Sequence, residues 1–599
     1  NTKFYATYSN ERELQPFPIQ LWWRNGGAVP YPSAVDGHNI SQLVSTNLTH
    51  VFSPSITNEF LFGLSYTDFV NSFRDPSKVS RKTLGINHPG IFNASNDQVP
   101  SFDLAWNGPS VFNPGGFIPN LYAKKWEPSF ADNFTKVKGT HTLKFGGYYE
   151  LTTNAQPGNP FTNGFAAPNT WNGGSSGNAM ADLLVGETGY WQEDNKVILH
   201  NEGYHTVEFY ADDNWRVNSR LTLDLGLRAT HLGAWYDRTG VGPAVFNPNL
   251  YGSDLNSGAA LPGIRWNKID HSVPLSGATT RALFYEPRVG FAYDLGGSGN
   301  TVVRGGFGAY RFHDPQNNNG IDTANGFLDT SVSGKTFSQI DSFNPGQLVT
   351  NVGTVLDQQD NQQPVTYDYS LSVTRRTFAS SSLNLSYVGS DSKHLTNGGY
   401  GNINLVPYGA MLNDPDPNHQ GLYRPLSASN YSGGLTVQEH NLYSNYNSLQ
   451  AMWSKQSGNL NYTFAYTFSK ALGIQGANGY GTKADQFDLR HHDYGILAFD
   501  RTNALSVSYS YLLPAFVKGW MNSGNHLGQI ALDGWQLSGV SQLVSGIPIQ
   551  PNSSSNFSLQ VVGINSFLAY TGSPDASFQP VLSCDPSKNL ATDQWIKLS

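Results

Sequence analysis

The sequence is poor in charge and in cysteine, and it has no long apolar run. Lys and Arg number 36 and Asp and Glu number 44 among 599 residues, so charged residues make up 13%, about half the usual share. The single cysteine, Cys584, excludes a disulfide framework and a cysteine-based zinc site. No stretch of about 18 apolar residues exists, which excludes a transmembrane helix. The net charge of -8 and the lack of a basic run argue against nucleic acid as a partner.

Three further observations narrow the class of protein. The excess of Ala, Glu, Lys, Leu and Arg that helical bundles need is missing. Aromatic residues reach 13%, beside 62 Gly and 33 Pro, and this aromatic content excludes a disordered chain. No signal peptide is visible: the segment 3–9 reads as a strand already in progress, and the last residues end without a turn. We therefore expect the chain to be a fragment of a longer protein.

Apolar residues recur with a period of two, which is typical of β-strands. In the segments 220–228 and 459–469, Leu or aromatic residues alternate with polar or small residues (Thr, Asn, Ser, Asp, Arg, Gly and Ala). In a strand that crosses a bilayer the apolar row faces lipid and the polar row, here Thr222, Asp224 and Arg228, faces the lumen. We therefore predict eight lipid-facing residues: Leu221, Leu223, Leu225, Leu227, Tyr462, Phe464, Tyr466 and Phe468.

The predicted strands form hairpins with short turns of Gly, Ser, Asn and Pro, the residues that tight turns need. Six hairpins are expected, over 46–66, 127–149, 205–231, 283–312, 365–389 and 446–469. Between them lie connections rich in Gly, Asn, Pro, Ser and aromatic residues: 67–126, 150–204, 232–282, 313–364, 390–445 and 470–500. Because most connections in compact domains have ~4–6 residues, this alternation favours an outer-membrane barrel with short periplasmic turns and long extracellular loops.

Adding the strands 3–9, 501–512 and 529–545 brings the count to about fifteen. The fold predicted is all-β, a large antiparallel transmembrane barrel that is partial in this chain. Soluble sandwiches show the same alternation, and a propeller would show a repeat of about 40–50 residues, which is not found. Periodicity alone leaves the membrane barrel and a soluble β-protein open, and the regular asymmetry of the connections favours the barrel.

Few residues are candidates for a catalytic or metal-binding site. The cluster Arg490–Asp493 holds two histidines, but neighbours on a strand point to opposite faces, so His491 and His492 would not readily chelate one metal. The same divergence separates the carboxylates of Asp212 and Asp213, whereas glycoside hydrolysis needs a facing pair. No G-x-S-x-G nucleophile motif occurs. We expect no catalytic, metal or cofactor site, and a lumen-lining position for Asp212.

Tryptophans in or beside the long connections are the remaining binding signal. Such residues stack on ligands, but they also pack loops and anchor proteins at membrane interfaces, where Trp and Tyr are enriched. We favour anchoring or loop packing for any single one of them: Trp22, Trp23, Trp106, Trp126, Trp171, Trp191 and Trp235.

Several motifs, in their order along the chain, resemble a known family. The most specific match is Phe209–Val217 followed by Leu221–Arg228; the others are Thr140–Gly147, Ala181–Gly186, Pro287–Asp294, Val303–Gly308, Tyr446–Gln450 and Gly534–Gly539. Together they resemble the barrel of Oar-like TonB-dependent outer-membrane transporters of the acidobacterial type, over about residues 45–550.

The resemblance implies that residues 1–599 are the barrel portion of such a transporter, with about 15 of roughly 22 strands. The family's N-terminal regulatory-like domain, TonB-contacting segment, plug and closing strands are not found in this sequence. Expected partners are outer-membrane lipid, a TonB-type energy-coupling protein acting through the missing N-terminal segment, and an unknown small ligand, peptide or oligosaccharide. The ligand-binding residues stay open.

Two alternative functions stay open as well. One is a secreted soluble adhesin or glycan-binding protein, and the other is a β-rich polysaccharide-degrading enzyme. A barrel should partition into the outer membrane and depend on amphiphile, unlike either alternative.

Overall fold

The computed structural model describes most of the 599 residues. The described ranges are 1–17, 33, 35–92, 97–102, 122–157, 161–167, 176–314, 320–344, 353–397, 401–428, 431, 434–474, 487–488, 491, 494–520, 526–548 and 568–576.

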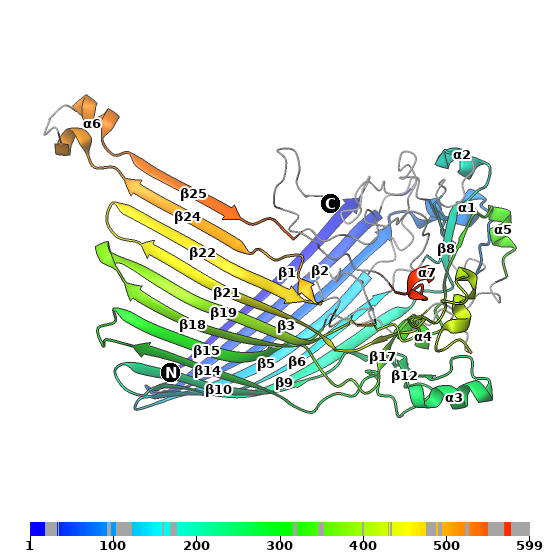
Figure 1. The fold of residues 1–599 in the computed structure, drawn as a ribbon, viewed down its shortest axis with the longest axis horizontal. Helices are drawn as coiled ribbons and strands as arrows, with labels where there is room; N and C mark the ends of the chain where they lie inside the picture. The colour runs from blue at the N-terminus through cyan, green and yellow to red at the C-terminus, as the bar shows by residue number, and fades with distance from the viewer. Residues whose placement is uncertain are drawn as a thin grey trace.

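One curved antiparallel sheet of 17 strands dominates the described chain (Figure 1). Two of the strands are short, β11 (Tyr236–Asp237) and β23 (Gly495–Ile496). The other fifteen agree with the predicted number: β1 (Thr2–Phe17), β2 (Val35–Ser53), β3 (Ile56–Phe73), β5 (Tyr122–Lys138), β6 (His141–Pro157), β9 (Leu199–Arg216), β10 (Leu221–Leu232), β14 (Phe284–Asp294), β15 (Thr301–Arg311), β18 (Val365–Arg376), β19 (Ser381–Leu395), β21 (Leu442–Lys455), β22 (Leu460–Gly473), β24 (Asn503–Leu512) and β25 (Gln536–Val544).

Each long strand pairs with the next long strand along the chain, so the sheet is a simple meander. All six predicted hairpins are present, and their turns lie at one end of the sheet while the long connections lie at the other (Figure 1). Gly458 sits in one of these turns at φ +75°, a conformation that residues with a Cβ rarely adopt. Among the described residues β1 pairs only with β2 and β25 only with β24, so these two strands are the sheet edges.

Several predicted strand boundaries were wrong. The first strand runs to Phe17 rather than to residue 9, and β3, β6, β19 and β22 extend four to eight residues into segments that we expected to be loops. There both faces of the strands are covered, as the buried run at Thr152–Asn154 shows, so the alternation on which the prediction depends is absent. The predicted strand 529–545 also begins too early, because His526–Leu532 is a helix, α6.

The long connections fold together rather than remaining separate loops. One small sheet joins β16 (Asp329–Ser333), β8 (Tyr190–Asp194), β7 (Phe165–Ala166) and β4 (Ser101–Phe102). A second joins β13 (Ile264–Arg265), β12 (Val245–Phe246), β17 (Thr354–Asp357) and β20 (Thr436–Gln438). We call the described parts of 74–121, 158–198, 233–283, 312–364 and 396–441, together with 568–576, the loop layer.

Short helices complete the loop layer, and three helical segments lie at the turn end of the sheet. Those of the loop layer are η1 (Pro76–Val79), α1 (Arg81–Leu84), α2 (Ala179–Leu184), α3 (Pro248–Ser257), α4 (Ile321–Ala324), α5 (Phe337–Asp341), η5 (Pro417–Tyr423) and α7 (Leu568–Thr571). At the turn end lie η4 (Phe378–Ser380), η7 (Phe516–Trp520) and α6.

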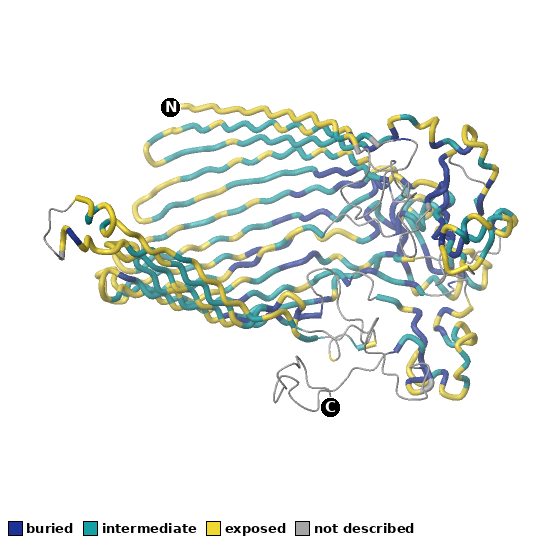
Figure 2. Tube along the Cα trace, turned by 90° about the horizontal axis from the view of Figure 1, so that it is seen from above, coloured by how far each residue is buried: buried dark blue, intermediate teal, exposed yellow. Residues whose placement is uncertain are grey.

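Buried residues gather in the loop layer and in the strand ends that meet it (Figure 2). Trp191 and Ile340, both 0% exposed, pack with Ile91 and Ala166 from three different connections. A second cluster includes Phe246, Val355 and Leu435, again from three connections. The apolar core of the described chain therefore lies at the loop end, because the middle of a one-layer sheet has no second layer to pack against.

We predict that Trp191→Ala destabilises the loop layer by about 3–5 kcal/mol, since it removes a fully buried aromatic side chain and leaves a cavity. Hydrogen exchange with mass spectrometry should show faster exchange in β8, β16 and α5, with the central part of the large sheet unchanged. Leu422→Ala is the matched control because Leu422 is 74% exposed. An equal loss of protection across the large sheet would contradict a separately stabilised loop layer.

Candidate functional site

The two faces of the large sheet differ in the polarity of their side chains. One lateral row crosses nine strands with only apolar and aromatic residues: Leu221, Tyr293, Val303, Val373, Leu385, Ala451, Tyr466, Leu505 and Leu543. The register places all eight residues predicted to face lipid on this apolar face. Several of them are well exposed in the protein alone, for example Leu227 at 50% and Phe468 at 47%.

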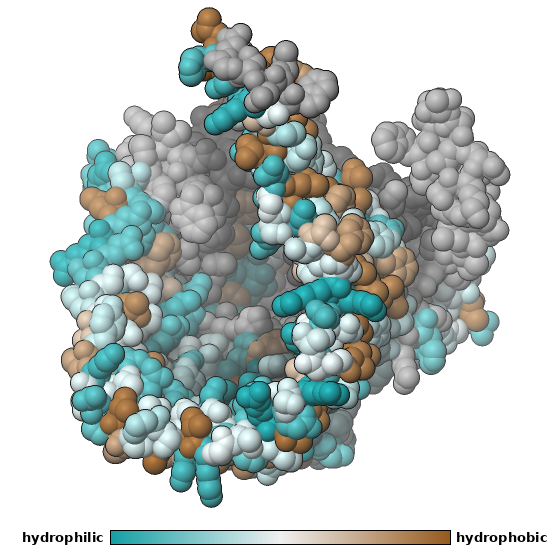
Figure 3. All heavy atoms as spheres, turned by 90° about the vertical axis from the view of Figure 1, so that its left-hand side faces the viewer, coloured by the Kyte–Doolittle hydropathy of each residue, from teal (hydrophilic) through white to brown (hydrophobic). Residues whose placement is uncertain are grey.

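The opposite face is polar. The row next to the apolar one reads Thr222, Ala292, Arg304, Ser372, Ser386, Gln450, Thr467, Ala504 and Val544, so six of its nine residues are polar. Seen from the turn end, the sheet curls around a hollow, and hydrophobic residues gather on the outer side of the wall at the right (Figure 3).

Charged side chains on the polar face are paired where β9, β10 and β14 run side by side. Arg228 forms an ion pair with Glu208, and Thr230 Oγ1 donates to Glu286 Oε1 at 2.8 Å. Nearby, the Tyr210 hydroxyl donates to Asn133 Oδ1 at 2.7 Å. These pairs satisfy charged and hydroxyl groups of the polar face within the sheet itself.

At the loop end, His440 lies between two carboxylates. Its Nδ1 is 2.7 Å from Asp360 Oδ2, and its Nε2 contacts Asp314 Oδ2. Burial alone would lower the pKa of His440, but the hydrogen bonds to Asp314 and Asp360 outweigh it and raise the pKa to about 9. The imidazolium therefore joins the connection before β21 to both ends of the connection between β15 and β18.

A cavity of about 60 Å³ lies beside this ion cluster. Its walls come from the loop ends of β9 and β10 and from three connections of the loop layer. The lining includes Trp235, Gln363 and four carboxylates, those of Glu202, Asp314, Asp357 and Asp360. Trp235 is held by its Nε1, which donates to the backbone oxygen of Asp314 at 3.0 Å.

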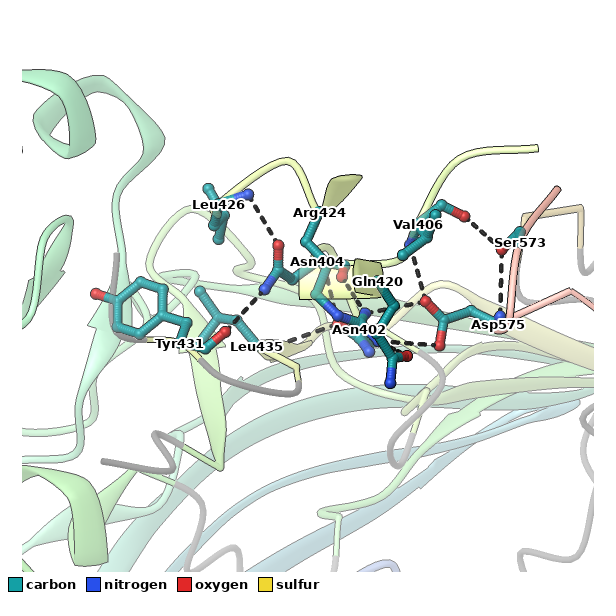
Figure 4. A network of polar contacts seen from close by, with 10 residues as sticks. All are labelled: Asn402, Asn404, Val406, Gln420, Arg424, Leu426, Tyr431, Leu435, Ser573 and Asp575. Atoms are coloured by element: carbon teal, nitrogen blue, oxygen red, sulfur yellow. Dashed lines mark hydrogen bonds and ion pairs between the residues drawn. The ribbon is translucent and has the colours of Figure 1, made fainter. Parts of the chain in front are cut away.

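A second polar network ties the segment 568–576 into the loop layer (Figure 4). Arg424, 8% exposed, donates from Nη1 to Asp575 Oδ2 at 2.9 Å and to the backbone oxygen of Asn404 at 2.6 Å. The Val406 amide also donates to Asp575, at 2.8 Å, and Ser573 Oγ donates back to the Val406 oxygen at 2.6 Å. The chain beyond β25 is thereby anchored over the connection between β19 and β21.

The candidate catalytic and metal-binding residues of the sequence do not converge. Asp212 and Asp213 lie on opposite faces: Asp212 pairs in register with Gly226 on the polar face, as expected, and Asp213 Oδ2 is 2.7 Å from His141 Nδ1 on the other. His491 pairs with Asp488 at 2.8 Å and is exposed, while Arg490, His492 and Asp493 lie outside the described residues. In the part of the chain that the structure describes, no group of three or more His, Cys, Asp or Glu is placed to hold a metal ion.

The scattered tryptophans have different roles. Trp191 is fully buried and packs the loop layer, and Trp126 lies in β5 at 47% exposed. Trp235 lines the cavity. Trp22, Trp23, Trp106 and Trp171 lie outside the described residues.

Sequence reasoning missed the ion cluster of His440, Asp314 and Asp360. These residues are separated by 46 to 126 positions and belong to no motif. Only the antiparallel meander, which returns every second strand to the same end, brings them together.

The fold and the two-faced sheet define a class of protein. The chain belongs to the family described as outer membrane beta barrel domain, whose model matches residues 1–597. Membership locates the protein in the outer membrane. None of the described helices is both long and apolar enough to span a membrane.

Solved structures with a similar fold include three transporters. They are the outer membrane transporter YddB from Escherichia coli (10% identity, 85% of this chain and 52% of that one, TM-score 0.45), the copper transporter OprC (11%, 86% and 61%, 0.37) and the FrpB iron transporter from Neisseria meningitidis (11%, 86% and 64%, 0.35). The chain thus spans between half and two thirds of the length of these proteins. No curated protein matches the sequence.

The His440 cluster predicts a pH dependence. Because the folded-state pKa of about 9 lies above the ordinary value of 6.5, its stabilisation is fully present below about pH 6.5 and is lost as the pH rises through about 9. We expect hydrogen-exchange protection factors around β20 and the start of β21 to fall between about pH 6.5 and pH 10. His440→Gln should show low, pH-independent protection there, and a wild-type protein that keeps full protection at the alkaline end would contradict the prediction.

Proposed function

We propose that this chain is the barrel portion of an energy-coupled outer-membrane transporter that captures a ligand at the loop layer and imports it through the polar lumen. The observation that carries the proposal is the pairing of a face that bears an unbroken apolar row across nine strands with a polar, charge-paired face on a fifteen-strand meander. Such a sheet suits lipid outside and water inside.

The lipid-facing assignment of the eight residues is part of the proposal. Exposed Leu and aromatic side chains in an unbroken row across nine strands would be an aggregation hazard on a soluble protein, whereas acyl chains would cover them. This observation favours the membrane transporter over a secreted adhesin or glycan-binding protein.

The Oar-like subtype and coupling to a TonB-type protein rest on the resemblance of the sequence motifs. We infer that a plug and an N-terminal segment belonging to the longer protein gate the lumen and contact the coupling protein. The missing barrel strands would pair with the edges β1 and β25, since an unpaired strand edge in lipid costs several kcal/mol for each unsatisfied group.

We also propose that the chain is not an enzyme. Among the described residues, the candidate carboxylates Asp212 and Asp213 diverge, so the paired geometry for hydrolysis of glycosides is missing. Binding and gating require no catalytic group.

A pair of substitutions tests the lipid face. Leu223→Arg places a charge on the apolar face and should cost about 2–4 kcal/mol of folding free energy at the depth of the bilayer midplane, and less towards either interface. Thr222→Arg, one residue away on the polar face, should be nearly neutral. Urea unfolding from lipid vesicles measures both, and equal costs for the two variants would contradict the assignment of faces.

Uptake tests the transport function. Cells that express the full-length protein would be offered labelled ferric siderophores, oligopeptides and oligosaccharides, with and without the inner-membrane coupling protein. We expect accumulation of one class to require the coupling protein, while binding to the cell surface survives its deletion. Accumulation that persists without the coupling protein would indicate a passive pore instead.

A further inference from the structure

The connection between β24 and β25 differs from the other connections at the turn end of the sheet. Those have two to six residues, whereas this one runs from Leu513 to Trp535 and contains η7 and α6. It projects beyond the strand ends at the upper left of Figure 1. We call its described parts, 513–520 and 526–535, the helical tip.

We propose that the helical tip binds a phospholipid surface, the membrane interface at the turn end of the barrel. The inference rests on the proposed function insofar as the apolar face of the sheet lies in lipid.

The helical tip presents large apolar side chains to its surroundings. Leu527 and Ile530 of α6 are 80% and 81% exposed, and they share one side of the helix because they are three residues apart. Trp535 and Phe516 are exposed as well. Since α6 has no buried residue, internal packing does not explain its apolar side chains. A gathering of exposed apolar groups of this kind marks an interaction surface.

Hydrogen bonds hold the helical tip in one arrangement. The Asp533 carboxylate accepts from the amides of Val517 at 2.7 Å and of Lys518 at 3.1 Å, which joins η7 to the end of α6. Trp535 Nε1 donates to the backbone oxygen of Ala531 at 2.8 Å, so the indole is held against the helix. The exposed apolar side chains are therefore carried by a hydrogen-bonded unit.

The apolar face of the sheet continues into the helical tip. Tyr511 and Leu537 are paired in register on the face that also carries Leu543. The Leu513 amide donates to the Trp535 oxygen at 2.9 Å, which extends the pairing of β24 and β25 by one step. Because side chains alternate along a strand, Leu513 and Trp535 follow Tyr511 and Leu537 on the same face. A lipid layer that covers this face therefore leads directly to the helical tip.

The charges of the connection also suit a phospholipid surface. Lys518 and Asp533 are its only Lys, Arg, Asp or Glu residues. Two backbone amides engage the Asp533 carboxylate, whereas Lys518 is exposed. A lysine beside an apolar surface extends its ammonium towards anionic lipid head groups, and tryptophan is enriched at the same boundary. Apolar groups with a cation and a tryptophan are typical of segments that lie in a membrane interface.

Depth-dependent fluorescence quenching tests the proposal. The full chain has one cysteine, Cys584, so Cys584→Ser gives a background for single cysteines that carry a nitrobenzoxadiazole label. The labelled variants are Leu527→Cys in the helical tip, Leu225→Cys on the apolar face of β10 and, as the control, Ser298→Cys in the exposed turn between β14 and β15. Each is reconstituted in vesicles of phosphatidylethanolamine and phosphatidylglycerol. The quenchers are lipids spin-labelled near the head group, lipids spin-labelled at the end of the acyl chain, and aqueous iodide.

We expect the label at Leu527 to be quenched more strongly by the shallow spin label than by the deep one, because an interfacial segment lies about 5–10 Å into the boundary between head groups and acyl chains. The label at Leu225 should be quenched by lipid, and the label at Ser298 mainly by iodide. Adding Ile530→Asp to the Leu527→Cys variant should abolish its quenching by lipid, because it places a charge within the apolar surface. Ile530→Val is the matched control and should retain the quenching.

Two results at Leu527 would overturn the inference and leave the proposed function standing, provided that lipid quenches the label at Leu225. One is a label that only iodide quenches. The other is a label that neither iodide nor lipid quenches, which would indicate that protein covers the helical tip. A label at Leu225 that lipid does not quench would contradict the proposed function and overturn the inference with it.

Discussion

Backbone hydrogen bonding between neighbouring strands is the interaction on which the rest of this structure depends. In a bilayer each strand must satisfy its N–H and C=O groups through its neighbours, and the meander does so by pairing each long strand with the next one along the chain. With the backbone satisfied in this way, side chains are free to differ between the two faces. The apolar row from Leu221 to Leu543 and the polar row beside it follow from that freedom.

The same topology explains why the apolar core lies at the loop end. An antiparallel meander delivers alternate connections to one rim, where they are close enough to pack. The connection 312–364 supplies β16 to one small sheet and β17 to the other, so it links the clusters around Trp191 and Phe246. The loop layer therefore has an apolar core of its own, whereas the middle of the one-layer sheet has none.

The ion pairs at the loop end of the sheet depend on the packing of the loop layer. His440, Asp314 and Asp360 form an ion cluster because the loop layer brings them within hydrogen-bonding distance, and these hydrogen bonds outweigh the cost of burying the imidazolium. Beside the cluster, a small acidic and aromatic cavity lies between the loop layer and the ends of β9 and β10. In the same way, the ion pair between Arg424 and Asp575 connects the segment beyond β25 to the loop layer.

The sequence by itself determined the all-β class, the number of long strands, all six hairpin turns and which residues share a face. These features are local: alternation along Leu221–Leu227 or Tyr462–Phe468 reports one face of one strand, and turn residues report where the chain reverses. Only the tertiary structure decided the strand ends, the two small sheets, the His440 cluster and the cavity. Where strands enter the loop layer both faces are covered and the alternation disappears, and the partners of His440 lie up to 126 positions away, a distance that no local pattern reports.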